Sequence, residues 1–125
     1  MKSQIAVMAV GIAVSLFSAG TPAAAEAAAA IDGATAKALA AAGAKVVDVR
    51  TPQEFASGHV PGAINIPFDE IGKRAAEIGP PSTRVVLYCR TGRRSGIAAD
   101  ALDKAGYKKV YDFRTVTAWP GELAK

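Results

Sequence analysis

Cysteine and histidine are the scarcest reactive side chains in this chain, with one of each among 125 residues. A single cysteine excludes an internal disulfide framework and any metal cluster held by several cysteines, and a histidine-based metal site or catalytic triad would depend on His59 alone. No run of five or more lysines and arginines occurs and the net charge of +4 is mild, so we expect no nucleic-acid partner. These absences leave a domain with one thiol, Cys89, which is either an inert buried side chain or a nucleophile.

The first 25 residues differ in composition from the rest of the chain. Lys2 is followed by a largely apolar stretch over residues 5–17 and then by small residues that end at Ala25. A positive start, a short apolar stretch and an A-x-A end are typical of a secretory signal peptide. We therefore expect a signal peptide over residues 1–25 and a mature domain over residues 26–125 in the periplasm. Retention of the segment as a membrane anchor is the alternative, because no charge follows Lys2 within it.

Segments typical of helices and strands alternate through the remainder of the chain. The pattern predicts strands over residues 45–50, 63–67, 84–88 and 109–113, and helices over residues 34–42, from 51 onwards, 69–78 and 94–105. Asp32 and Thr51 are placed to cap the first two helices. Such alternation favours an α/β fold, a single domain with a mostly parallel sheet of four to five strands and helices on both faces.

Cys89 follows directly on the third predicted strand, where ligands bind in parallel sheets, beyond the carboxyl ends of the strands. The loop after it leads to the start of a helix, whose free N–H groups favour an anion. Gly92 permits the tight backbone conformation that turns amides inward. Three arginines, Arg90, Arg93 and Arg94, lie within five residues of the sulfur. These features favour the thiolate, and we expect Cys89 to be a nucleophile.

Other polar residues near the predicted crevice have more than one candidate role. Asp48 and Arg50 end the first predicted strand and either bind substrate or brace loops through ion pairs, for instance between Arg50 and Glu54. His59 lies in a glycine- and proline-rich turn and is expected to hold that loop rather than to act as a base. Ser95 is expected to be a helix N-cap or an early-turn donor with a hydroxyl contact to the sulfur.

The segment Cys-Arg-Thr-Gly-Arg-Arg-Ser at residues 89–95 resembles the active-site loop of the rhodanese-domain sulfurtransferases, a cysteine followed by four residues and an arginine. Residues 47–55 and 58–67 resemble the upstream signature of the same family, and residues 106–107 and 110–111 its later strand. The resemblance covers residues 31–113, and with the N-terminal segment the chain is most similar to the small periplasmic rhodaneses of the phage-shock type. It departs from the family at residues 114–119, which hold a Trp but no glycine where a Gly-Gly pair is usual.

The resemblance implies sulfur transfer from thiosulfate or a similar donor to cyanide or a thiol, through a persulfide on Cys89 and without a metal or organic cofactor. The partners would be a small anionic sulfur donor and a thiophilic acceptor, with no membrane contact after signal cleavage, and we expect a monomer. The donor would bind the loop residues Arg90, Thr91, Gly92, Arg93, Arg94 and Ser95. Within that loop, Arg90 and Arg93 are the better candidates for donor contact, while Arg94 occupies a position that is often structural; Asp48 and Arg50 would be supporting residues.

Three alternatives stand beside this interpretation. A non-catalytic sulfur-carrier or binding module is compatible with the altered tail. A phosphatase or arsenate reductase would place five residues between cysteine and arginine, whereas four separate Cys89 from Arg94. A disulfide oxidoreductase is disfavoured because no second cysteine exists to resolve a mixed disulfide.

Overall fold

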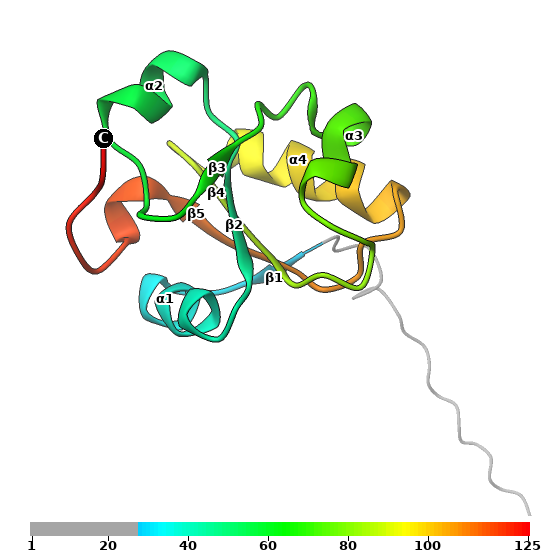
Figure 1. Ribbon diagram of the computed structural model, residues 1–125, viewed down its shortest axis with the longest axis horizontal. Helices are drawn as coiled ribbons and strands as arrows, with labels where there is room; N and C mark the ends of the chain where they lie inside the picture. Colours follow the sequence, from blue (N-terminus) through cyan, green and yellow to red (C-terminus); the bar gives the residue numbers. More distant parts are fainter. Residues whose placement is uncertain (1–27) are drawn as a thin grey trace, which may run out of the picture.

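A five-stranded parallel sheet forms the centre of the protein (Figure 1), as seen in a computed structural model that describes residues 28–125. Its strands are β1 (Ala29–Ala30), β2 (Lys45–Asp48), β3 (Ile64–Asn65), β4 (Val85–Cys89) and β5 (Val110–Thr115), and they lie in the order β1-β5-β4-β2-β3. Every pair of neighbours is parallel. The predicted α/β fold is confirmed; the expected signal peptide lies outside the described residues.

Local sequence signals set the starts of the first two helices. Asp32 caps α1 (Gly33–Ala41), and its carboxylate accepts a hydrogen bond from the Thr35 amide at 2.8 Å. Thr51 and Glu54 form a reciprocal capping box at the start of α2 (Pro52–Ser57). Both caps occur where the sequence predicted them, because a cap depends only on residues three positions apart.

Two further helices complete the layers. The predicted helix over residues 69–78 is shorter and forms as α3 (Ile71–Arg74) followed by a turn of 3-10 helix (Ala75–Glu77). The fourth, α4 (Arg93–Lys104), begins one residue before the predicted start. A second 3-10 turn (Val116–Ala118) follows β5, and none of the helices within residues 28–125 is long and apolar enough to cross a membrane.

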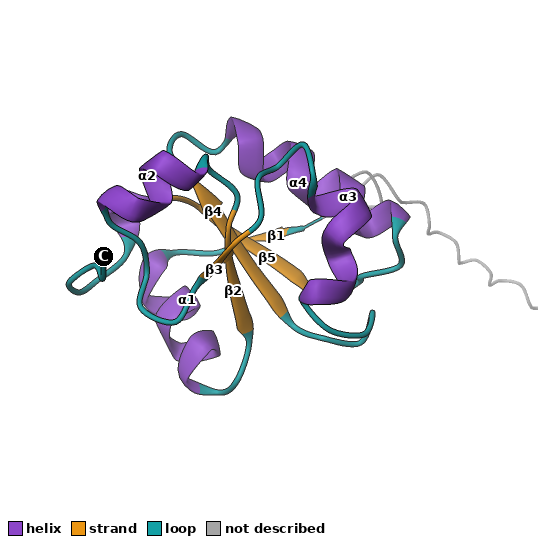
Figure 2. Cartoon of the chain, turned by 45° about the horizontal axis from the view of Figure 1, so that its top comes forward, coloured by secondary structure: helices purple, strands orange, loops and turns teal. Residues whose placement is uncertain are grey.

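The sheet has α1 on one face and α3 and α4 on the other (Figure 2), and the central strand β4 contributes side chains to the hydrophobic cluster on each face. Val85, Leu87 and Cys89 pack on the side of α3 and α4, and Val86 and Tyr88 pack on the side of α1. All five side chains are completely buried, as expected for a strand covered on both faces. Because side chains alternate along a strand, Cys89 is fixed on the α4 side, the side from which the following helix begins.

Candidate active site

Cys89 is the last residue of β4 and has no exposed surface. The chain turns sharply after it and enters α4 at Arg93. The turn depends on Gly92, whose φ of 101° lies in the left-handed region that residues with a Cβ avoid. The amide of Gly92 is thereby directed at the sulfur and donates a hydrogen bond to Cys89 Sγ at 2.9 Å.

The surroundings of the sulfur favour its ionised form. Burial raises the pKa of the Cys89 thiol, but contacts with the Ser95 hydroxyl and with the amides of Ser95, Gly92 and Thr91 lower it. The hydrogen bonds outweigh burial, so the pKa lies below that of an ordinary cysteine. A larger thiolate fraction makes the sulfur a better nucleophile near neutral pH.

Ser95 connects the sulfur to a buried carboxylate that the sequence reasoning missed. Its Oγ lies 3.6 Å from Cys89 Sγ and donates to Asp112 Oδ2 at 3.0 Å. Burial raises the pKa of Asp112, and hydrogen bonds from Ser95 and from the Arg114 amide oppose that rise. Of the two roles expected for Ser95, the early-turn donor is correct, because the N-cap position is occupied by Gly92. The signal for Asp112 was an acidic residue inside an apolar strand that ends at the same edge of the sheet.

The three arginines of the loop have different environments. Arg94 forms two hydrogen bonds with the Glu54 carboxylate of α2, at 2.8 and 3.0 Å, and its side chain is 18% exposed. This pair holds the pKa of Glu54 down, to about 2. Arg90 is 73% exposed and lies 3.9 Å from Glu54, whereas the guanidinium carbon of Arg93 lies 6.0 Å from the centre of the Phe68 ring. Arg94 therefore joins the loop to α2, whereas Arg90 makes only a long contact with the same carboxylate.

Asp48 and Arg50 form a buried ion pair with each other. The Arg50 guanidinium donates to both Asp48 oxygens, with a shortest distance of 2.6 Å, and also to the carbonyl oxygen of Gly58. The expected pairing of Arg50 with Glu54 is wrong, because Glu54 is already held by Arg94 and by its own helix cap. The pair braces the loop after α2, and its hydrogen bonds within the described residues do not extend to the sulfur.

His59 holds the same loop through several contacts. Its Nδ1 lies 2.9 Å from the carbonyl oxygen of Phe55, and the two rings stack with their centres 3.7 Å apart. Its backbone pairs with that of Ala124 near the C-terminus. These contacts explain the position of the His59 side chain as that of a residue that holds the loop, so no role in proton transfer is needed.

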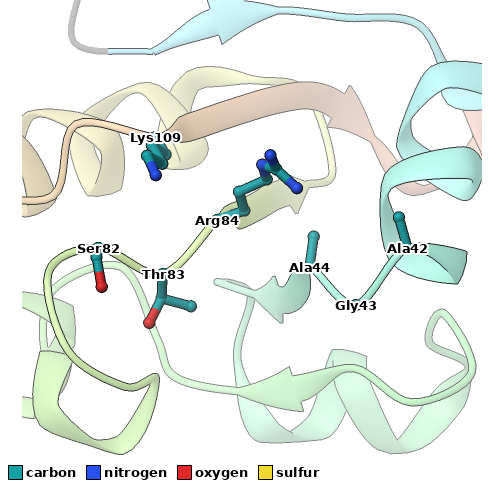
Figure 3. A pocket seen from close by; sticks show the side chains of 7 residues that line it. All are labelled: Ala42, Gly43, Ala44, Ser82, Thr83, Arg84 and Lys109. Atoms are coloured by element: carbon teal, nitrogen blue, oxygen red, sulfur yellow. The ribbon is translucent and has the colours of Figure 1, made fainter.

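A surface hollow of about 340 Å³ lies at the opposite end of the strands (Figure 3). It is lined by Ala42, Gly43, Ala44, Ser82, Thr83, Arg84 and Lys109. These residues precede β2, β4 and β5, whereas Cys89 ends β4, so the hollow is separate from the candidate site. Within residues 28–125 no group of three or more histidine, cysteine, aspartate and glutamate side chains is arranged to hold a metal ion.

The fold and the site together define a class of protein, a small parallel α/β domain with one buried cysteine in an amide-lined loop before a helix N-terminus. Within that class the chain belongs to the rhodanese-like domain family, whose family model matches residues 25–115.

Several known proteins share the sequence or the fold. The chain is 43% identical over 65 residues to the thiosulfate sulfurtransferase PspE of Escherichia coli, a match that covers 51% of this chain and 62% of that protein. It is 43% identical over 75 residues to a sulfurtransferase of Allochromatium vinosum, covering 59% and 69% respectively. A solved structure titled "rhodanese with anions from E. coli" superposes with a TM-score of 0.61 at 34% identity, covering 65% of this chain and 96% of that one. Three of the curated relatives are matched over 35% to 64% of their own length.

Proposed function

We propose that the protein is a sulfurtransferase that moves a sulfane sulfur from thiosulfate, or a similar anionic donor, to cyanide or a thiol. The observation that carries the proposal is the buried Cys89 sulfur with the Gly92 amide 2.9 Å away and a lowered pKa. A sulfur in this setting is both a nucleophile and a position where a negative charge is stabilised. Family membership and the sulfurtransferase relatives support the same activity.

The reaction has two steps that balance without a cofactor. In the first, the Cys89 thiolate attacks the outer sulfur of thiosulfate, a new S–S bond forms, and sulfite leaves with the electron pair of the bond that breaks. In the second, cyanide attacks the outer sulfur of the persulfide, thiocyanate forms, and the Cys89 thiolate is restored. Covalent transfer in two steps predicts ping-pong kinetics.

The loop residues have two roles: some stabilise negative charge on the sulfur, and others attract the donor. The amides of Thr91, Gly92 and Ser95, together with the N-terminus of α4, stabilise the thiolate and the persulfide anion. Arg90, which makes only a 3.9 Å contact with Glu54 and is largely exposed, and Arg93, which lies beside the Phe68 ring, attract the anionic donor.

The remaining three residues stabilise the site without contact to the donor. Arg94 keeps the loop in place through Glu54. Asp48 and Arg50 act as supporting residues through the loop that follows α2.

We also propose that residues 1–25 direct export to the periplasm, are removed after Ala25, and leave a monomeric domain over residues 26–125. Intact mass spectrometry of the exported protein tests this, because a mass starting at Glu26 is expected. A mass that retains the first residues would favour an anchor instead. Size-exclusion chromatography under reducing conditions tests the monomer.

The activity is tested by a thiosulfate:cyanide assay with Cys89→Ala as the control. The wild-type protein should form thiocyanate, and treatment with thiosulfate alone should add about 32 Da, one sulfur atom, to the intact mass. The alanine variant should show neither. If the wild-type protein forms no thiocyanate and gains no sulfur, the proposal is wrong.

A sulfur-carrier module is the second candidate, and the absence of glycine from residues 114–119, where the family usually has a Gly-Gly pair, favours it. A carrier would gain the mass of one sulfur but release it only to a protein partner and not to cyanide. A phosphatase would instead hydrolyse p-nitrophenyl phosphate in steady turnover that Cys89→Ala abolishes.

A further inference from the structure

Arg114 has an unusual backbone conformation for its residue type. Its φ of 75° lies in the left-handed region, and within residues 28–125 no other residue except glycine has a positive φ. A side chain with a Cβ is disfavoured there, which is why glycine normally occupies such positions. Residues held in disfavoured backbone regions cluster at functional sites, so the surroundings of Arg114 indicate what the conformation achieves.

The conformation belongs to a bulge near the end of β5. Leu87 pairs with Asp112, but the next residue of β4, Tyr88, pairs with Arg114, so β5 carries one extra residue at this point. The Asp112 carboxylate accepts the Arg114 amide at 2.8 Å and the Ser95 hydroxyl at 3.0 Å. The buried aspartate thus holds the left-handed turn and contacts the serine beside the sulfur.

The bulge brings the Arg114 side chain onto the catalytic loop. Its Cβ, Cγ and Cδ lie 3.3, 3.4 and 3.5 Å from the position that a Cβ would take on Gly92, the residue whose amide contacts the Cys89 sulfur. The residue is exposed and forms no ion pair with a carboxylate of residues 28–125 within 4.0 Å. The aliphatic part of the Arg114 side chain therefore packs on the loop that carries Arg90 and Arg93, and its guanidinium has no carboxylate partner in the described residues.

We propose that Arg114 is a specificity-determining residue that attracts anionic ligands to Cys89 and favours those with more than one negative charge. The left-handed backbone is retained at a cost in stability because it directs a cation to the loop, where glycine would supply none. This inference rests on the proposed function for the nature of the ligand, a sulfur donor such as thiosulfate, but not for the electrostatic effect itself.

The electrostatic effect can be measured without sulfur transfer, by alkylation of Cys89 with a charged and a neutral reagent. Iodoacetate is an anion and iodoacetamide is neutral, and both react with the same thiolate, so the ratio of their rates reports the local potential. Arg114→Gln should lower the iodoacetate to iodoacetamide ratio by about threefold to tenfold at low salt, and high salt should reduce the difference. Arg84→Gln removes the same charge at the opposite end of β4 and should leave the ratio unchanged.

The choice of donor provides the second measurement. Arg114→Gln should lower kcat/KM more for thiosulfate, a dianion, than for an organic thiosulfonate, a monoanion. Arg114→Gly should show the same selective loss together with a higher melting temperature, because glycine accepts the left-handed conformation. An unchanged alkylation ratio in both Arg114 variants, or an equal loss for the two donors, would overturn the inference. If the wild-type protein transfers no sulfur, the proposed function fails while the alkylation ratio still decides the role of Arg114.

Discussion

Replacement of Asp112 by asparagine should make the Cys89 thiol more acidic. The aspartate carboxylate and the cysteine sulfur both contact the Ser95 hydroxyl, which has one proton to donate. While Asp112 is ionised, its carboxylate accepts the hydrogen bond from the Ser95 hydroxyl. Its negative charge also opposes a second negative charge on the sulfur. The asparagine of an Asp112→Asn variant would keep the shape and an oxygen for the Arg114 amide but would carry no charge.

The size of the effect follows from two distances, from the Ser95 hydroxyl to the Cys89 sulfur and to the Asp112 carboxylate. Ser95 Oγ lies 3.6 Å from Cys89 Sγ and 3.0 Å from Asp112 Oδ2, so the sulfur and that oxygen are at most about 6.5 Å apart. At an effective dielectric constant of about 20, unit charges at that distance repel by roughly 2.5 kcal/mol, or about two pKa units. The positive charge of Arg114 offsets part of this repulsion. We expect the pKa of Cys89 to fall by about 1 to 2 units in the Asp112→Asn variant.

The assay is the pH dependence of thiolate absorbance, or of the iodoacetamide rate, in the wild type and the variant. Asp100→Asn, which removes an exposed carboxylate from the middle of α4, is the matched control and should leave the titration unchanged. The acid side of the pH–activity profile should move to lower pH together with the thiol. A Cys89 pKa in Asp112→Asn that equals or exceeds the wild-type value would refute the proposed effect of Asp112 on the sulfur, whatever the change in stability.

Three further substitutions test other parts of the site. Glu54 has a folded-state pKa lowered to about 2, so its stabilising contribution is present above pH 4.5 and lost as the pH falls through about 2. Glu54→Gln should lower the free energy of unfolding by about 1–2 kcal/mol at pH 7, allowing for solvent screening, and match the wild type near pH 2. Arg50→Met leaves the buried Asp48 carboxylate unpaired and should cost about 3–5 kcal/mol in urea unfolding. Gly92→Ala should displace the amide that contacts the sulfur, so the pKa of Cys89 should rise in a thiolate titration.

Glu54→Gln has a matched control, and each of the three substitutions has an outcome that contradicts it. Glu77→Gln alters an exposed ion pair and should change stability by less than about 1 kcal/mol. A Glu54→Gln variant with the same stability deficit at pH 2 as at pH 7 would show that the effect is not the ion pair. For Arg50→Met, a loss below about 1 kcal/mol would mean that the pair is dispensable. For Gly92→Ala, an unchanged thiol titration would mean that the Gly92 amide does not lower the pKa of Cys89.

Local signals were sufficient to predict most of the fold. The runs of β-branched and aromatic residues in β2 and β4 specify buried strands, and Asp32 and Thr51 specify helix starts through contacts three residues away. The position of Cys89 at a strand end before a helix followed from the same reasoning. By contrast, β1 (two alanines) has no strand signal of its own and forms because β5 offers an edge to pair with.

The side-chain partners within the site could not be predicted in the same way. Glu54 and Arg94 are separated by 40 positions and meet only because α2 and the start of α4 lie at the same end of the sheet. The sequence analysis named Arg50 as the partner of Glu54, whereas the structure packs Arg50 against Asp48 and Gly58 and leaves Glu54 to Arg94. The left-handed turn at Arg114 depends on a bulge whose register is set by β4, which no local pattern encodes.

The two outermost strands of the sheet, β1 and β3, are only two residues long. At the end of β3, the Asn65 side chain donates to the carbonyl oxygens of Asp48 and Arg50, which ties this short edge strand to the chain of β2 beside it. Short edges leave little free backbone for another chain to pair with, and this is one way in which proteins prevent their sheets from growing into aggregates. The strongly apolar strand that carries the cysteine is thus kept at the centre, where a second molecule cannot reach it by strand addition.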